Sequence, residues 1–179
     1  MSKAYKTLRV LIVDADKFSR DLIKDILESL GFEGERIFRT GNGAEALESL
    51  RTNKMDIVIC ARTMGSIDGV TFVRTLRDPE ESPAPGVPVI FCSRQLDRQL
   101  VDEIRGAGVN EVIAKPITIS AIESRVRVLL EKPRPLLEVS DYVGPDRRRV
   151  DEGNIHLTGL EQSDTRRFFL HTHNFELVD

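Results

Sequence analysis

Five short apolar runs recur along the chain, and each is bounded by residues that favour turns. An unbroken apolar run of this length is typical of a parallel strand buried on both faces of its sheet. The central run, at residues 55–61, reads MDIVICA and leads into a loop that closes on Asp68-Gly69. The five predicted strands are residues 8–13, 37–40, 55–61, 89–93 and 110–114.

Apolar residues recur every three to four positions between these runs, which predicts helices. The first helix is expected from Asp16 to a terminating glycine. Its buried face is expected to carry Phe18, Leu22, Ile26 and Leu30. The other four helices are predicted after residue 43 and at residues 69–77, 96–106 and 118–130.

Strands that alternate with helices at these spacings imply right-handed crossovers. The predicted fold class is therefore α/β, a five-stranded parallel sheet covered by helices on both faces in a doubly wound three-layer sandwich. In such a sheet, the functional residues lie at the carboxyl ends of the strands. The residue at that end of the central run is Ala61.

The pattern of the sequence changes after residue 131. Residues 132–135 read KPRP and predict a linker, because proline interrupts the preceding helical pattern. The rest of the chain shows no long periodic segment. Residues 1–131 are therefore predicted as one domain, and residues 132–179 as a C-terminal extension.

The composition and the lengths of the apolar runs argue against several classes of protein. The chain of 179 residues is 40% hydrophobic and 31% charged, as in an ordinary globular protein. Its net charge of −3 gives no indication that it binds nucleic acid or anionic lipid. No apolar run approaches the roughly 18 residues of a membrane span, and the first residues lack the apolar core of a signal peptide. A cytoplasmic protein is expected, with Cys60 and Cys92 as reduced core residues.

The sequence contains, in this order, VLIVDAD, DIVICARTMGSIDG, VIFCS and Lys115-Pro116. These motifs resemble one family, the CheY-like receiver domain of two-component response regulators. VLIVDAD resembles its acidic corner after the first strand, and DIVICARTMGSIDG resembles the strand and loop of its phosphoacceptor. VIFCS ends at the position of the switch hydroxyl, and Lys115-Pro116 follows the fifth strand. The resemblance covers roughly residues 8–130 and implies a flavodoxin- and CheY-like (βα)5 fold.

In that family, an aspartate at the end of the third strand accepts a phosphoryl group, and two acidic residues after the first strand help to hold Mg²⁺. A lysine and a hydroxyl then bond the phosphate. The resemblance implies that Asp14 takes the first acidic position, Ser93 the switch hydroxyl and Lys115 the lysine. Ala15 stands at the second acidic position, and Ala61 stands at the phosphoacceptor.

An alanine methyl group offers neither a nucleophile nor a metal ligand. The sequence therefore predicts a degenerate pocket without the aspartyl phosphorylation cycle, with weak or no Mg²⁺ binding, no metal site and no cofactor. Two further departures are Gly65 at the loop proline and Val112 at the aromatic switch position.

Two other carboxylates lie near these positions in the sequence. Asp16 could approach the metal position, but it is interpreted as the N-cap of the first helix. Asp56 begins the third strand, far from the carboxyl end, and is interpreted as structural. With two acids missing, Lys115 is expected to pair with Asp14 alone.

The extension contains the consecutive residues Arg147, Arg148 and Arg149. Three guanidinium groups can clamp phosphates or carboxylates, so three interpretations stay open: ion pairs within the chain, a protein partner, or a nucleotide such as cyclic di-GMP. His171 and His173 alone are weak grounds for a metal site.

Phe168, Phe169 and Phe175 place three of the eight phenylalanines of the chain within the last residues of the extension. Exposing so many aromatic side chains is unfavourable. The segment is therefore expected either to dock on its own domain or to enter the groove of a partner.

These observations favour a phosphorylation-independent receiver that acts as a protein-interaction module in bacterial two-component signalling. The expected partner is a histidine kinase, a phosphotransferase or another regulator, and a homodimer stays open. The alternatives are a cyclic-dinucleotide sensor that uses the arginine-rich tail and an orthodox phosphorylated single-domain regulator. No enzyme motif appears, and the extension is too short for a DNA-binding effector domain.

Overall fold

A computed structural model describes residues 5–139 and 142–147, and the backbone of residues 166–168. Its centre is a five-stranded parallel sheet with the strand order β2-β1-β3-β6-β7. The strands are β1 (Val10–Val13), β2 (Ile37–Thr40), β3 (Ile57–Ala61), β6 (Val89–Ser93) and β7 (Glu111–Ala114). All residues of β1, β3 and β6 are buried, as the unbroken apolar runs predict.

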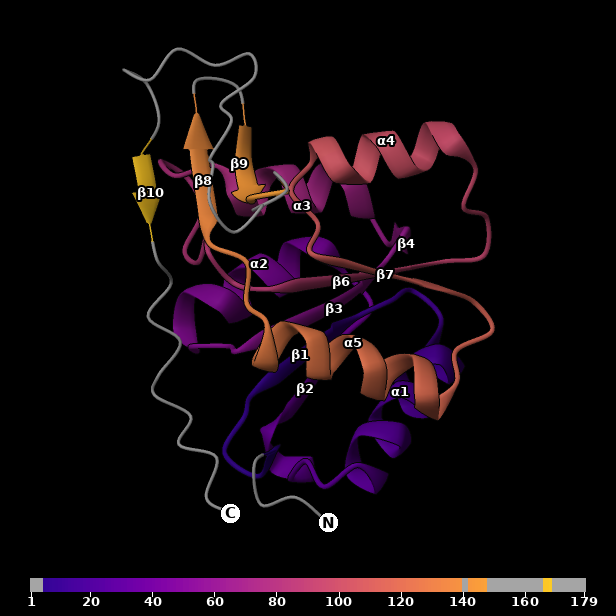
Figure 1. Ribbon diagram of the computed structural model, residues 1–179. Coiled ribbons are helices and arrows are strands. Elements are labelled where there is room, and N and C mark those ends of the chain that lie inside the picture. Colours follow the sequence, from indigo (N-terminus) through magenta and orange to yellow (C-terminus); the bar gives the residue numbers. More distant parts are fainter. Residues whose placement is uncertain (1–4, 140–141, 148–165, 169–179) are drawn as a thin grey trace.

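Five helices cover the two faces of the sheet (Figure 1). They are α1 (Lys17–Ser29), α2 (Gly43–Thr52), α3 (Gly69–Arg77), α4 (Arg98–Gly106) and α5 (Ile119–Glu131). Apolar residues of α1 and α5 form one core with the sheet, and those of α2, α3 and α4 form the other. This is the α/β doubly wound sandwich that the sequence predicts. A short 3₁₀ helix, η2 (Gly34–Arg36), and a small hairpin of β4 (Thr63–Met64) and β5 (Ile67–Asp68) complete the domain.

Each of the five α-helices begins at a side-chain cap. The capping side chain accepts a hydrogen bond from a free N–H group of the first helical turn, which would otherwise lack a partner. Asp16 is the cap of α1 and accepts from the Phe18 N–H, which confirms the interpretation from the sequence. The other caps are Asn42, Asp68, Asp97 and Thr118.

The predicted buried face of α1 is wrong at its first two positions. Phe18 is 83% exposed and Leu22 is 46% exposed, whereas Ile23, Ile26 and Leu27 are the buried residues. The reason is helix geometry. Four residues turn a helix by roughly 400°, so a strict four-residue spacing drifts by roughly 40° at each step. Phe18 therefore lies well away from the inward face that Ile26 occupies.

The extension contains more regular structure than its sequence predicts. β8 (Leu136–Val139) and β9 (Tyr142–Pro145) form an antiparallel hairpin, and β10 (Arg166–Phe168) pairs with the other edge of β8. Within β9, the Tyr142 hydroxyl donates a hydrogen bond to Pro145 O at 3.0 Å. Figure 1 shows the hairpin beside α3. A domain boundary at residue 131 stays a prediction.

The hairpin contacts the loop between α4 and β7. Gly108 adopts φ +89°. A Cβ atom on Gly144 would lie only 2.6 Å from the Cα atom of Gly108, so the two segments approach closely because both positions lack a side chain. Arg147 donates a hydrogen bond to Val109 O. The extension is therefore packed on the sheet domain at this point.

Candidate functional site

A cavity of about 440 Å³ lies at the carboxyl edge of the sheet. The ends of β1, β3, β6 and β7 each contribute to its wall, as expected for a parallel sheet. Its lining residues are Asp14, Ala15, Asp16, Ala61, Arg62, Thr63, Cys92, Ser93, Arg94, Gln95 and Lys115. The structure thus brings together Asp14, Ala15, Ala61, Ser93 and Lys115.

An ion pair between Asp14 and Lys115 spans this cavity. Lys115 Nζ lies 2.5 Å from Asp14 Oδ2, and both side chains are largely buried. The other carboxylate oxygen of Asp14 accepts from the Asp16 N–H at 2.9 Å, and Lys115 also donates to Ser19 Oγ at 3.1 Å. A buried carboxylate with both oxygens engaged is held in one position, because losing either partner would leave it poorly solvated.

Alanine occupies the two positions where the resemblance predicts carboxylates. Ala61 is 3% exposed and ends β3, so its methyl group lies at the wall of the cavity. Ala15 N–H donates to Thr63 O at 2.9 Å, which ties the loop after β1 to the loop after β3. Neither side chain can supply an oxygen to the cavity.

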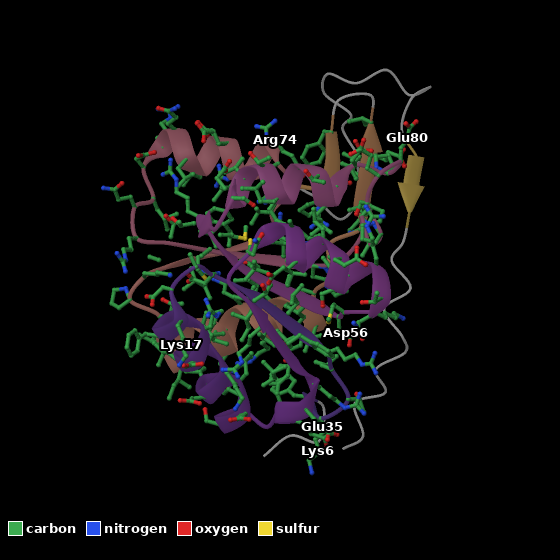
Figure 2. All side chains as sticks on the ribbon, turned by 180° about the vertical axis from the view of Figure 1, so that it is seen from behind. Lys6, Lys17, Glu35, Asp56, Arg74 and Glu80 are labelled. Carbon is green, nitrogen blue, oxygen red and sulfur yellow. The ribbon has the colours of Figure 1, made fainter. Side chains whose placement is uncertain are left out.

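The two other candidate carboxylates have structural partners. Asp16 accepts hydrogen bonds from Ser19 Oγ and the Phe18 N–H, and the Ser19 bond is the main reason that the pKa of Asp16 is lowered. Asp56 accepts from the Arg9 N–H at 2.8 Å before β3 begins. Figure 2 shows Asp56 at the opposite side of the sheet from Lys17, the residue after Asp16.

Ser93 and Gly65 have local roles in the loops around the cavity. Ser93 Oγ donates to Gln95 O at 2.7 Å, so the hydroxyl is bonded within its own loop. Gly65 adopts φ +63°, which proline cannot adopt because its ring holds φ near −65°. Val112 in β7 is partly buried against the core.

The structure describes few of the candidate residues in the extension. Arg147 donates a hydrogen bond to the Val109 carbonyl oxygen, a contact that none of the three interpretations of the arginine triplet specified, and the choice among them stays a prediction. Phe168 is described by its backbone in β10, opposite Leu136. Arg148, Arg149, His171, His173, Phe169 and Phe175 lie outside the described residues. Within the described ranges, no group of three or more histidine, cysteine, aspartate or glutamate side chains could hold a metal ion.

Sequence reasoning missed Arg77, which ends α3 and is 3% exposed. Its guanidinium group donates to Gly108 O at 3.0 Å, Pro85 O at 2.7 Å and Val87 O at 2.8 Å, and to the Asn110 side chain at 3.0 Å. Burial lowers the pKa of Arg77 to about 10, so the group is still charged at neutral pH. Helical periodicity gives no signal for such a residue, because a helix-ending arginine is ordinarily exposed.

Sequence reasoning also missed three exposed apolar residues on the neighbouring helices α1 and α5. Phe18, Leu22 and Ile119 are the exposed large hydrophobic residues of the described chain, and Ile119 is 54% exposed. Phe18 and Leu22 lie one turn apart on α1, and Ile119 begins the neighbouring α5. The bond from Lys115 to Ser19 joins the first turn of α1 to the loop that leads into α5. We call these three residues the α1/α5 patch.

The fold and the cavity can be compared with known proteins. A family model described as "Response regulator receiver domain" matches residues 10–127. A probable chemotaxis protein CheY from Rhizobium etli is 33% identical over 72% of this chain and 96% of that protein. Chemotaxis protein CheY-3 from Vibrio cholerae is 28% identical over 71% of this chain and 95% of that protein.

A solved structure agrees with these sequence matches. The putative response regulator from Chloroflexus aurantiacus superposes with a TM-score of 0.63 at 28% identity, and covers 71% of this chain and 100% of its own. Within the described residues, no helix is long and apolar enough to cross a membrane.

Proposed function

The chain belongs to the response regulator receiver domain family, and we propose that it acts there as a phosphorylation-independent protein-interaction module. Receiver domains interact with histidine kinases and other signalling proteins, so a partner of this kind is the natural expectation. The observation that carries the proposal is the cavity itself. Ala61 occupies the end of β3, where the resemblance implies the phosphoacceptor, and Lys115 is already paired with Asp14.

The same cavity is a poor site for the Mg²⁺ that the family resemblance implies. A hard divalent cation needs several oxygen ligands, and carboxylates supply most of its charge neutralisation. Asp14 has one oxygen on Lys115 and the other on the Asp16 N–H, and Asp16 caps α1. We therefore expect the pocket to keep its shape through the Asp14–Lys115 pair, in place of a bound metal ion.

The α1/α5 patch supports an interaction role. Exposed apolar side chains that gather on one surface mark sites of association more often than scattered ones do. An 83% exposed phenylalanine one turn from a 46% exposed leucine presents an i, i+4 pair that fits the groove between two helices of a partner. We propose that this patch contacts a helical segment of a kinase or phosphotransferase.

The first test asks whether the protein takes up a phosphoryl group. The full chain is incubated with a small phosphodonor and Mg²⁺, and its intact mass is measured. We expect no covalent gain. The double variant Ala15→Asp, Ala61→Asp is the matched comparison, because it restores both missing carboxylates. A phosphoryl adduct on the unaltered chain would refute the proposal and favour an orthodox regulator.

The second test asks whether the patch binds partners. The full chain and the variant Phe18→Ser, Leu22→Ser are compared for binding to a panel of sensor-kinase and phosphotransfer domains from the source organism. Loss of about 2 kcal/mol, or roughly thirtyfold in affinity, is expected if these residues are interface anchors. Arg74→Ser is the control, because Arg74 is exposed on α3, away from the patch. Equal binding by all three proteins would exclude the patch as the binding site.

A further inference from the structure

A second cavity, of about 460 Å³, lies at the opposite edge of the sheet, where the strands begin. It lies between the end of α2, the loop before β6 and the end of α5. Its floor is apolar and includes Leu8, Leu50, Met55, Val87, Leu129 and Leu130. We call this cavity the basal groove. It is separate from the cavity at the carboxyl edge, since the two share no lining residue.

The rim of the basal groove carries positive charge. Arg51 and Lys54 are both exposed and both line the groove. Arg51 lies 3.9 Å from Glu48, and donates a long hydrogen bond of 3.4 Å to Glu81 O. Asp56 also lines the groove and accepts a hydrogen bond from the Arg9 N–H, so the lining carries two basic side chains and one acidic side chain. An apolar floor with basic residues at its edge suits an apolar peptide that carries acidic side chains.

Strand β10 directs the end of the chain toward this groove. β10 is antiparallel to β8, and its last residue, Phe168, pairs with Leu136, the first residue of β8. Four linker residues separate Leu136 from the end of α5 at Glu131, and the groove residues Leu129 and Leu130 belong to that last helical turn. Figure 1 shows β10 on the outer side of β8, with its carboxyl end pointing back toward the sheet domain.

The residues that follow β10 have the matching chemistry. Residues 169–179 read FLHTHNFELVD, with apolar side chains interspersed with Glu176 and Asp179. In an extended segment, Phe175 and Leu177 project to one side and Glu176 to the other. Eleven extended residues can span roughly 36 Å. This length is enough to reach the groove from the end of β10, because the last turn of α5, which lines the groove, lies close to β8 in the chain.

We propose that residues 169–179 dock into the basal groove of their own chain. Phe175 and Leu177 cover the apolar floor, and Glu176 approaches Arg51 and Lys54 at the rim. The interaction is intramolecular because β10 already holds the start of the segment beside β8, which gives it a high effective concentration at the groove. A covered groove would no longer accept a peptide from another protein.

A thiol placed in the groove tests this proposal in the full chain. Ala84 lines the groove and is partly exposed, so Ala84→Cys adds a small reporter. The native Cys60 and Cys92 are buried and give little background. The labelling rate of the introduced thiol is measured with and without Phe175→Ser, Leu177→Ser. We expect labelling about tenfold faster with the tail substitutions, which corresponds to a groove that is covered roughly nine-tenths of the time.

Controls separate docking from general loosening of the fold. Arg74→Cys places the same thiol on the exposed face of α3, where the tail substitutions should leave labelling unchanged. His173→Ser, Asn174→Ser alters polar residues of the same segment and should keep the groove covered. Glu176→Lys should raise labelling by about two- to threefold, since an exposed ion pair contributes only modestly to binding.

Two results would overturn the proposal. The first is equal labelling of the Ala84→Cys thiol with and without the Phe175 and Leu177 substitutions, which would mean that the tail does not cover the groove. The second is protection that grows with protein concentration, because the occupant would then be the tail of a second copy.

Discussion

Replacing Arg77 with methionine removes a buried charge that joins three parts of the molecule. Arg77 ends α3 and donates to the loop before β6, to Gly108 before β7 and to the Asn110 side chain. Within the described residues it forms no ion pair with a carboxylate, so neutral oxygens alone solvate its charge. Methionine fills a similar volume and donates no hydrogen bond.

The size of the effect follows from which oxygen atoms lose their donor. The bonds to Val87 O and Gly108 O are buried, whereas those to Pro85 O and Asn110 Oδ1 are partly buried and open to water. Each buried acceptor without a donor costs about 1–3 kcal/mol. Removing the charge recovers part of the desolvation cost of burying it. We expect a net loss of about 3 kcal/mol in the free energy of unfolding.

Urea unfolding of the full chain, followed by circular dichroism, measures this loss. For a slope of roughly 2 kcal/mol per molar urea, the midpoint should fall by about 1.5 M. Arg77→Lys should also destabilise, by about 2 kcal/mol, because an ammonium group cannot reach all four acceptors as a guanidinium fork does. The control is Arg74→Met on the exposed face of the same helix, which Figure 2 labels, with an expected change within about 0.5 kcal/mol. A loss for Arg77→Met below about 1 kcal/mol would refute the reasoning.

Three further predictions concern other buried groups. Gly69→Ala should destabilise the fold by about 2–4 kcal/mol in the same urea assay, because its Cβ would overlap Ala61 O, a backbone atom that cannot move aside; a neutral result would contradict this. Burial raises the pKa of Cys92 to about 12 and that of Cys60 well above its usual range. Both thiols should therefore resist alkylation at mildly basic pH until the chain is unfolded in urea. Rapid alkylation of the native protein would contradict this prediction. Burial is also the main cause that raises the pKa of Tyr142. The unfolded chain then releases this proton first, so stability should fall as the pH rises above roughly 10, and Tyr142→Phe should lessen that fall in pH-dependent unfolding.

The sheet and its edge could be predicted because they depend on local patterns. The runs at β1, β3 and β6 are apolar at every position that a doubly covered strand buries, and the predicted cap Asp16 directly precedes its helix. The resemblance to the receiver family assigned residues as far apart as Asp14 and Lys115 to one pocket, at the edge where parallel strands bring their carboxyl ends together. Their ion pair was expected because alanine stands at the other two acidic positions of that family, and the structure contains the pair.

The features that the sequence did not reveal depend on contacts between distant segments. Arg77 is buried because Gly108 and the loop before β6 surround it, and neither neighbour is visible in the pattern of α3. Phe18 is exposed because the four-residue spacing of α1 drifts around the helix, and its apolar character alone suggested the opposite. The hairpin of β8 and β9 has strands of four residues each, too short to show a clear alternation.

The contact between Gly108 and Gly144 has a practical consequence for shortening this chain. The hairpin covers the backbone of the α4–β7 loop, and that loop in turn accepts the buried bond of Arg77. A protein truncated at the end of α5 would retain every element of the parallel sheet but would expose the α4–β7 loop to water. We therefore expect the cooperative unit of folding to extend at least to Arg147, so that removing the extension would lower the melting temperature of the sheet domain.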